Sequence, residues 1–77
     1  MNNMKYILIN KEPVELFKIL KFEGIVSSGS EAKDVIAAGN VLVNGMIEKQ
    51  KRKKMVAGDT IEISGESFQL KLAANQE

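Results

Sequence analysis

Apolar residues recur along the chain with two different spacings, and each spacing predicts its own kind of element. Tyr6–Ile9 is a short, β-prone run that predicts a strand. Over residues 13–22 the apolar positions recur every three or four residues, which predicts an amphipathic helix. Pro13 suits the first turn of this helix, because an N–H group at that position would have no intrahelical partner. Gly24 is expected to end the helix.

A second, shorter helix is predicted where a serine-rich turn precedes another apolar stripe. This stripe consists of Ala32, Val35 and Ile36. Ser28 stands three residues before Glu31, which is the spacing of a capping box, while Ser30 is a competing N-cap. Gly39 suits the position just after the helix, where a positive φ is common.

The second half of the chain is dominated by alternating positions and tight turns. Val41–Val43 followed by Asn44-Gly45 predicts a strand that enters a type I′ hairpin, because this turn needs a positive φ at both central residues. Met46 and Ile47 would begin the return strand. Two later alternating runs predict strands at Thr60–Ile63 and at Phe68–Leu72, and residues 73–77 are expected to be a frayed tail. The order of elements predicts an α+β fold, with two helices packed on a small, mostly antiparallel β-sheet.

The composition excludes several classes of function. The 77 residues suffice for one small domain, which we expect to be 1–77. The chain contains no cysteine and no histidine, which excludes disulfides, thiolate metal sites and any Ser-His or Cys-His catalytic pair. No apolar stretch approaches the roughly 20 residues of a membrane-spanning helix, and the first apolar run is too short for a secretory signal. We therefore expect a cytoplasmic, monomeric protein without a cofactor, a metal or a membrane partner.

Positive charge is concentrated in KQKRKK, residues 49–54, although the formal net charge of the chain is only +1. The five charged members of this basic run are Lys49, Lys51, Arg52, Lys53 and Lys54. The run could be a solvated connection, a nuclear targeting signal or a surface that binds phosphates. Its place between a hairpin and a strand favours the third interpretation, because charges on a fixed backbone lose less conformational entropy on binding. As an extended segment, it would present odd- and even-numbered residues on opposite sides.

Other candidate chemistry is sparse. Ser28 and Ser30 have no histidine base, and helix capping accounts for at least one of them. Asp59 and Glu62 fit a turn and a solvent-facing strand position better than a catalytic pair. Lys33 either joins an anion site at the start of the second helix or is an ordinary exposed residue. The aromatic residues are expected to belong mostly to the core, not to base-stacking platforms; they are Tyr6, Phe17, Phe22 and Phe68.

Three motifs in order give the chain a family resemblance. FEGIVSSGSEAK resembles the helix–loop–helix junction of S4-type RNA-binding domains, DVIAAGNVLVNG resembles their I-x-x-G-x-V-x-V-N-G segment, and AGDTIEI resembles their closing G-D-x-I strand. The motifs span residues 22–63, and the match extends over 13–63 when the first helix is included. The little chain that remains on either side suggests a small stand-alone protein that resembles the YbcJ-like bacterial group.

This resemblance implies a fold with a two-helix αL-type motif and a non-enzymatic module that binds structured RNA, with ribosomal RNA as one candidate. Carried onto this chain, the RNA-facing residues are Ser28, Lys33, Lys49, Lys51, Arg52, Lys53 and Lys54. The chain departs from many S4 domains at Gly29, where they have an arginine. The alternative function is a small adaptor that docks an acidic protein partner at the ribosome or at a nucleic-acid enzyme, because a basic run also steers protein association.

Overall fold

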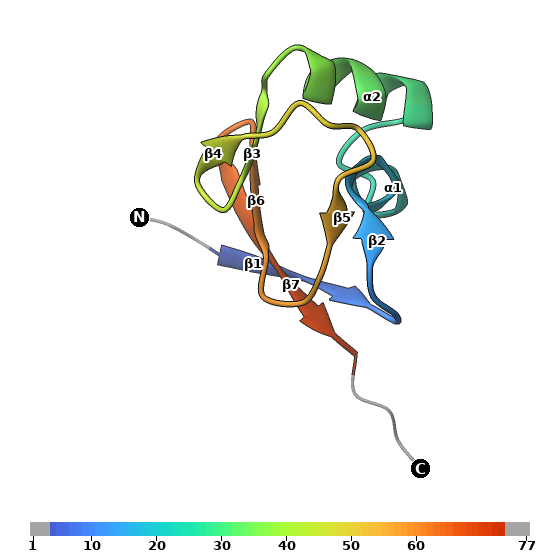
Figure 1. Cartoon of the computed structure of the whole chain (residues 1–77), viewed down its shortest axis with the longest axis vertical. Coiled ribbons are helices and arrows are strands. Elements are labelled where there is room, and N and C mark those ends of the chain that lie inside the picture. The colour runs from blue at the N-terminus through green and yellow to red at the C-terminus, as the bar shows by residue number, and fades with distance from the viewer. Residues whose placement is uncertain (1–3, 74–77) are drawn as a thin grey trace.

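The protein was analysed as a computed structural model that describes residues 4–73. Its main sheet has the spatial strand order β1-β7-β6-β3-β4 (Figure 1). These strands are β1 (Met4–Ile9), β7 (Glu66–Leu72), β6 (Thr60–Ile63), β3 (Val41–Val43) and β4 (Met46–Ile47). Every neighbouring pair is antiparallel except β1 and β7, which are parallel with Ile7 opposite Leu70. The predicted, mostly antiparallel sheet is therefore confirmed.

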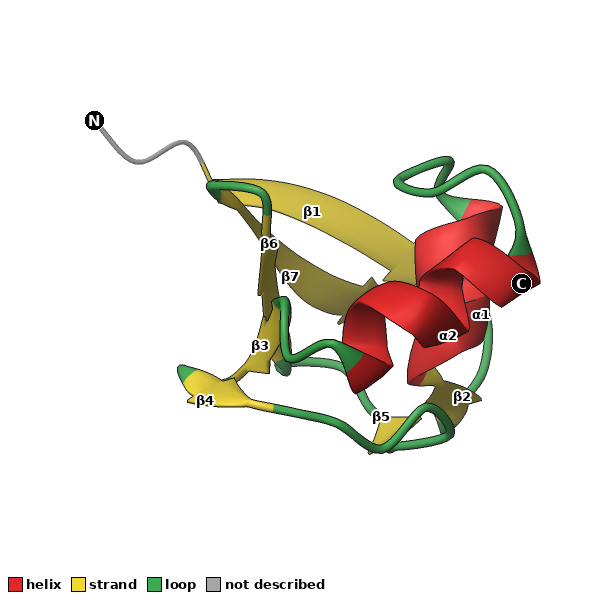
Figure 2. Ribbon diagram, turned by 90° about the horizontal axis from the view of Figure 1, so that it is seen from above, coloured by secondary structure: helices red, strands yellow, loops and turns green. Residues whose placement is uncertain are grey.

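The two predicted helices are present as α1 (Leu16–Phe22) and α2 (Gly29–Ala37). They pack against each other on one side of the sheet, and Figure 2 shows both helices together beside the ends of the strands. The largest fully buried side chains come from both helices, from strands of the main sheet and from the short strand β5 (Lys54–Met55); they are Leu16, Leu20, Ile36, Met55, Ile61, Leu70 and Val41. The α+β prediction is confirmed, and this shared core fixes the helices relative to the strands.

The start of the first helix was predicted wrongly. Pro13 does not open α1, because Val14–Glu15 forms a short strand, β2, that pairs antiparallel with β5 (Lys54–Met55). The Glu12–Pro13 peptide bond is cis. The β-branched Val14 is placed opposite Met55, which is completely buried, so a tertiary pairing overrides the local preference of proline for the first helical turn.

Local turn chemistry was predicted more accurately. Asn44 and Gly45 both have positive φ, of 53° and 84°, as the type I′ hairpin requires. Asp59 closes a turn, since its carboxylate accepts hydrogen bonds from the Val56 N–H at 2.9 Å and from the Asn44 side-chain amide at 3.2 Å. Glu62 is exposed, so both carboxylates have the structural roles that the sequence favoured.

The end of the sheet differs slightly from the prediction. β7 begins at Glu66, two residues before the predicted start, because the turn occupies only Ser64-Gly65. Ala73 donates its N–H to the carbonyl of Ile9 at 2.8 Å, so it continues the β1–β7 pairing instead of belonging to a tail. The rest of the predicted tail lies outside the described residues.

The aromatic residues are not all core. Phe68 is buried and Phe17 is half-buried, but Tyr6 and Phe22 are 56% and 68% exposed. Tyr6 precedes the buried Ile7 on β1, so the alternation of the strand turns its ring to the outer face. Phe22 is the last residue of α1, and its ring lies at the surface. The prediction for these two residues is wrong.

Candidate nucleic-acid interface

The basic run lies on a loop that leaves β4, passes along α2 and enters β5 beside the start of α1 (Figures 1 and 2). The run is not an extended segment with alternating sides, because residues 51 and 52 form a turn and only Lys54 belongs to a strand. The physical reason is the N-terminus of α1. The N–H groups of Leu16 and Phe17 have no partner inside the helix, and they donate to the carbonyls of Lys53 and Lys51 at 2.9 and 3.1 Å.

This hydrogen bonding fixes the backbone of the run while its side chains stay accessible. Lys49, Lys51, Arg52 and Lys54 are exposed, and Lys53 is half-buried. Lys49 packs near the C-terminal end of α2, since a Cβ atom built on Gly39 would lie 3.4 Å from its Cε. The partial negative charge at this helix end favours a nearby ammonium group. The run therefore begins against the end of one helix and finishes against the start of the other.

Phe17 brings the predicted site residues of two separate elements together. The Nζ of Lys33 on α2 lies 4.8 Å from the centroid of the Phe17 ring, and the Cζ of Arg52 lies 5.6 Å from the same centroid. The sequence left open whether Lys33 joins the basic run or stands alone. The structure places it in one cluster with Arg52.

Ser28 is the N-cap of α2. Its Oγ accepts a hydrogen bond from the Glu31 N–H at 3.0 Å, which leaves the hydroxyl proton free to donate. Ser30 lies inside the helix and is not the cap. The carboxylate of Glu31 does not return to Ser28 as in a regular capping box. It accepts instead from the Ser27 hydroxyl at 2.6 Å and from the Ser27 N–H at 2.9 Å.

These two hydrogen bonds, with the hydroxyl contributing most, hold the pKa of Glu31 below its ordinary value of 4.5. Glu31 is therefore charged at neutral pH, and its negative charge offsets part of the positive potential at the start of α2. Further positive potential near this helix start comes from the neighbouring cations Lys33 and Arg52.

Sequence reasoning missed Glu15 and Phe17. One carboxylate oxygen of Glu15, Oε1, lies 3.6 Å from Nη1 of Arg52 and 3.7 Å from Nζ of Lys18. The Glu15 side chain is only 19% exposed, so its carboxylate is largely buried beneath the side chains of Arg52 and Lys18. The spacing of Glu15 and Lys18 could have indicated their ion pair. No local signal could have indicated that Arg52 approaches either Glu15 or Phe17.

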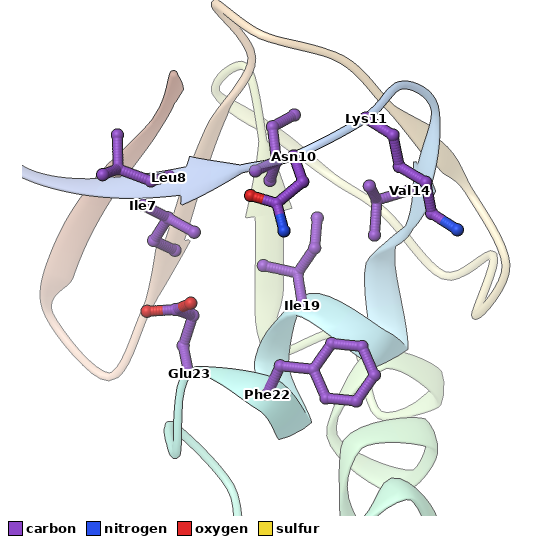
Figure 3. A pocket seen from close by; sticks show the side chains of 9 residues that line it. Ile7, Leu8, Asn10, Lys11, Val14, Ile19, Phe22 and Glu23 are labelled. Atoms are coloured by element: carbon purple, nitrogen blue, oxygen red, sulfur yellow. The ribbon is translucent and has the colours of Figure 1, made fainter. Parts of the chain in front are cut away.

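A pocket with a mainly apolar lining lies elsewhere. It has a volume of about 200 Å³ and opens between β1 and α1, with Ile7, Ile19 and Phe22 among its apolar lining (Figure 3). None of the predicted site residues lines it. Within residues 4–73, no group of three or more acidic side chains is placed to hold a metal ion. In the same range, no helix is long and apolar enough to cross a membrane.

A family model described as "S4 domain" matches residues 7–71. The chain belongs to the S4 domain family. Among curated S4 relatives, YbcJ of Escherichia coli (strain K12), named as a candidate RNA-binding protein, is 48% identical over 63 residues, which cover 80% of this chain and 90% of YbcJ. The "Probable ribosome maturation protein RlbA" of Bacillus subtilis (strain 168) is 35% identical over 65 residues, which cover 83% of this chain and 92% of RlbA.

Solved structures of S4 proteins agree with this assignment. The solution structure of E. coli YbcJ, described as revealing an alfa-L motif involved in RNA binding, matches with a TM-score of 0.67 and 46% identity, covering 91% of this chain and 90% of that one. The 30S ribosomal protein S4e of Thermoplasma acidophilum matches with a TM-score of 0.65 and 30% identity, covering 78% of this chain and 32% of that one. The family resemblance seen in the sequence is confirmed.

Proposed function

We propose that this S4 domain is a non-enzymatic RNA-binding module that recognises structured RNA. The observation that carries the proposal is the convergence of Lys33 and Arg52 on Phe17, because it joins α2 and the basic run into one positively charged surface. The names of the relatives support the same class of ligand, since YbcJ is described as binding RNA.

We assign one RNA-binding surface to the start of α2 and the basic run. Its residues are Ser28, Lys33, Lys49, Lys51, Arg52, Lys53 and Lys54. The lysines and the arginine would neutralise phosphates, and the Ser28 hydroxyl would donate a hydrogen bond. Side chains cannot read the deep major groove of A-form RNA, so such a surface recognises phosphate positions and helix shape more than sequence.

The proposed partner is structured RNA of the ribosome or of its assembly. This is supported by the name of RlbA, a ribosome maturation protein, and by the match to ribosomal protein S4e. The proposal also takes the whole chain, residues 1–77, to act as a single monomeric domain in the cytoplasm.

Fluorescence anisotropy with a labelled ribosomal RNA stem-loop tests this function. Contact with about four phosphates predicts that the logarithm of the binding constant falls with the logarithm of salt concentration with a slope of about −3 to −4. The double variant Lys33→Glu/Arg52→Glu is expected to weaken binding at 0.1 M salt by more than about 25-fold, because it removes two such contacts.

A matched control changes the same net charge on another part of the surface. Lys5 and Lys71 lie on β1 and β7, at the end of the sheet opposite to β4, the strand that leads into the basic run. The variant Lys5→Glu/Lys71→Glu should bind the stem-loop within about threefold of the wild type, because only long-range screened charge changes. Equal losses in both double variants would contradict a localised site. Retention of a protein partner after nuclease treatment, without any affinity for RNA, would favour the adaptor function instead.

A further inference from the structure

We propose that Phe17 is the positioning residue of the RNA-binding surface: its ring holds the Lys33 ammonium and the Arg52 guanidinium as a preformed clamp for the phosphodiester backbone. This inference rests on the proposed function and adds to it a residue that carries no charge. The ligand group that we propose for this clamp is the RNA phosphate.

The geometry of the cluster supports a clamp because two cations share one ring. Lys33 lies 4.8 Å and Arg52 lies 5.6 Å from the ring centroid, within the range of a cation–π interaction. The two cations therefore cannot be farther apart than the sum of these distances. Like charges this close repel each other, so their common attraction to the ring offsets the repulsion until an anion arrives.

The ring itself is fixed by the fold. The backbone N–H of Phe17 donates to the carbonyl of Lys51 at 3.1 Å, and the half-buried side chain packs against the hydrophobic core. A Cβ atom built on Gly29 would lie 3.9 Å from two atoms of the ring, so the ring also lies against the first turn of α2. Phe17, which belongs to α1, thus contacts both the basic run and α2.

Arg52 is held from a second direction by Glu15. The carboxylate lies 3.6 Å from Nη1, while 67% of the Arg52 side chain remains exposed. A guanidinium has five N–H donors in a planar fork, and the Glu15 contact at Nη1 leaves donors free for a phosphate. The ring and the carboxylate therefore orient Arg52 without exhausting its hydrogen-bonding capacity.

The energetic role of the ring is to order two flexible side chains before RNA binds. Immobilising a long side chain costs conformational entropy when RNA binds, and a cation–π contact orders the side chain before binding and so reduces that cost. Loss of the ring should therefore weaken RNA binding by about 5- to 30-fold through two cations, at a tenfold change per 1.4 kcal/mol.

The decisive comparison is between Phe17→Leu and Phe17→Tyr, measured with the ribosomal RNA stem-loop at 0.1 M salt. Leucine keeps an apolar side chain against the core but has no π face, so we expect the 5- to 30-fold loss. Tyrosine keeps the ring, so we expect affinity within about twofold of wild type. In an Arg52→Gln/Lys33→Gln background, the Phe17→Leu change should have less than a twofold effect, because the cations that the ring positions are gone.

NMR of the wild-type protein supplies a readout that does not depend on any variant folding. The methylene protons next to the Lys33 ammonium and the Arg52 guanidinium should be shifted upfield by the ring current of Phe17. Random-coil shifts for these protons would overturn the inference. So would wild-type affinity of Phe17→Leu, or an equal loss of affinity in the double-glutamine background.

Failure of this inference is distinguishable from failure of the proposed function. If the wild type binds the stem-loop and the Lys33→Glu/Arg52→Glu variant does not, but Phe17→Leu binds normally, the function stands and the positioning role is wrong. If the wild type has no affinity for the stem-loop, the proposed function is wrong, and the clamp proposal, which rests on it, is wrong as well.

Discussion

The substitution Gly29→Arg offers a gain of function whose size can be worked out from the structure. Gly29 is the first residue of α2, and a Cβ atom there would lie 3.8 Å from Cδ of Lys21 and 3.9 Å from the Phe17 ring. These are ordinary van der Waals contacts, and the residue does not have a positive φ, so a side chain can be added without a clash. The new guanidinium would stand beside the clamp.

The effect on stability should be small. Replacing glycine reduces the conformational entropy of the unfolded chain and stabilises by about 0.4–1 kcal/mol. A positive charge near a helix N-terminus opposes the helix dipole by about 0.3–1 kcal/mol. These contributions nearly cancel, so the free energy of unfolding should stay close to the wild-type value.

The effect on RNA binding should be larger. One additional phosphate contact makes the salt slope more negative by about 0.7–0.9, which corresponds to about five- to eightfold tighter binding at 0.1 M relative to 1 M salt. Anisotropy titrations with the stem-loop at several salt concentrations measure both quantities. Gly29→Gln is the matched control, because it adds a long polar side chain without charge. If Gly29→Arg binds no tighter than Gly29→Gln, the start of α2 does not face RNA phosphates and the assigned surface is wrong.

Two further predictions concern the acidic residues of the surface. Glu15→Gln should tighten stem-loop binding by a few fold and steepen its salt dependence, because the side chain beside Arg52 is kept while its negative charge, 3.6 Å from Nη1, is removed. Weaker binding would contradict this prediction and show that the charge of Glu15 is needed to orient Arg52. The folded-state pKa of Glu31 lies below 4.5, so its contribution to stability is present above that pH and is lost as the pH falls through the lowered value. Ser27→Ala should raise the pKa of Glu31 toward 4.5 in an NMR titration. The variant should also lose less of its free energy of unfolding when the pH is lowered. An unchanged pKa would show that the Ser27 hydroxyl does not hold the carboxylate.

Features that depend on neighbouring residues could be predicted from the sequence. The Asn44-Gly45 turn follows from the backbone conformation that the two residues permit, and it was correct. A serine N-cap follows from a serine placed before an apolar stripe, and of the two candidates that the sequence offered the structure uses Ser28. The helix start at Pro13 failed because the outcome depended on strand β5, which lies far along the chain.

In the candidate site, too, local features could be predicted from the sequence and tertiary contacts could not. The basic run is visible in the sequence as charge density, but its shape is set by the N–H groups of Leu16 and Phe17, which fold the loop into a turn. The approach of Arg52 to Phe17 is a tertiary contact between residues with no local relation. Periodicity predicted that Phe17 belongs to a helix, and only the packed structure shows what lies over its ring.

The most direct test of the account is to map the RNA contact on the protein residue by residue. Backbone amide and side-chain NMR shifts should be followed while the ribosomal RNA stem-loop is titrated into the wild-type protein. The account predicts that the large changes cluster at the start of α2, at Phe17 and along residues 49–54, with little change on the outer face of β1 and β7. Changes centred on β1 and β7, or spread evenly over the surface, would contradict it.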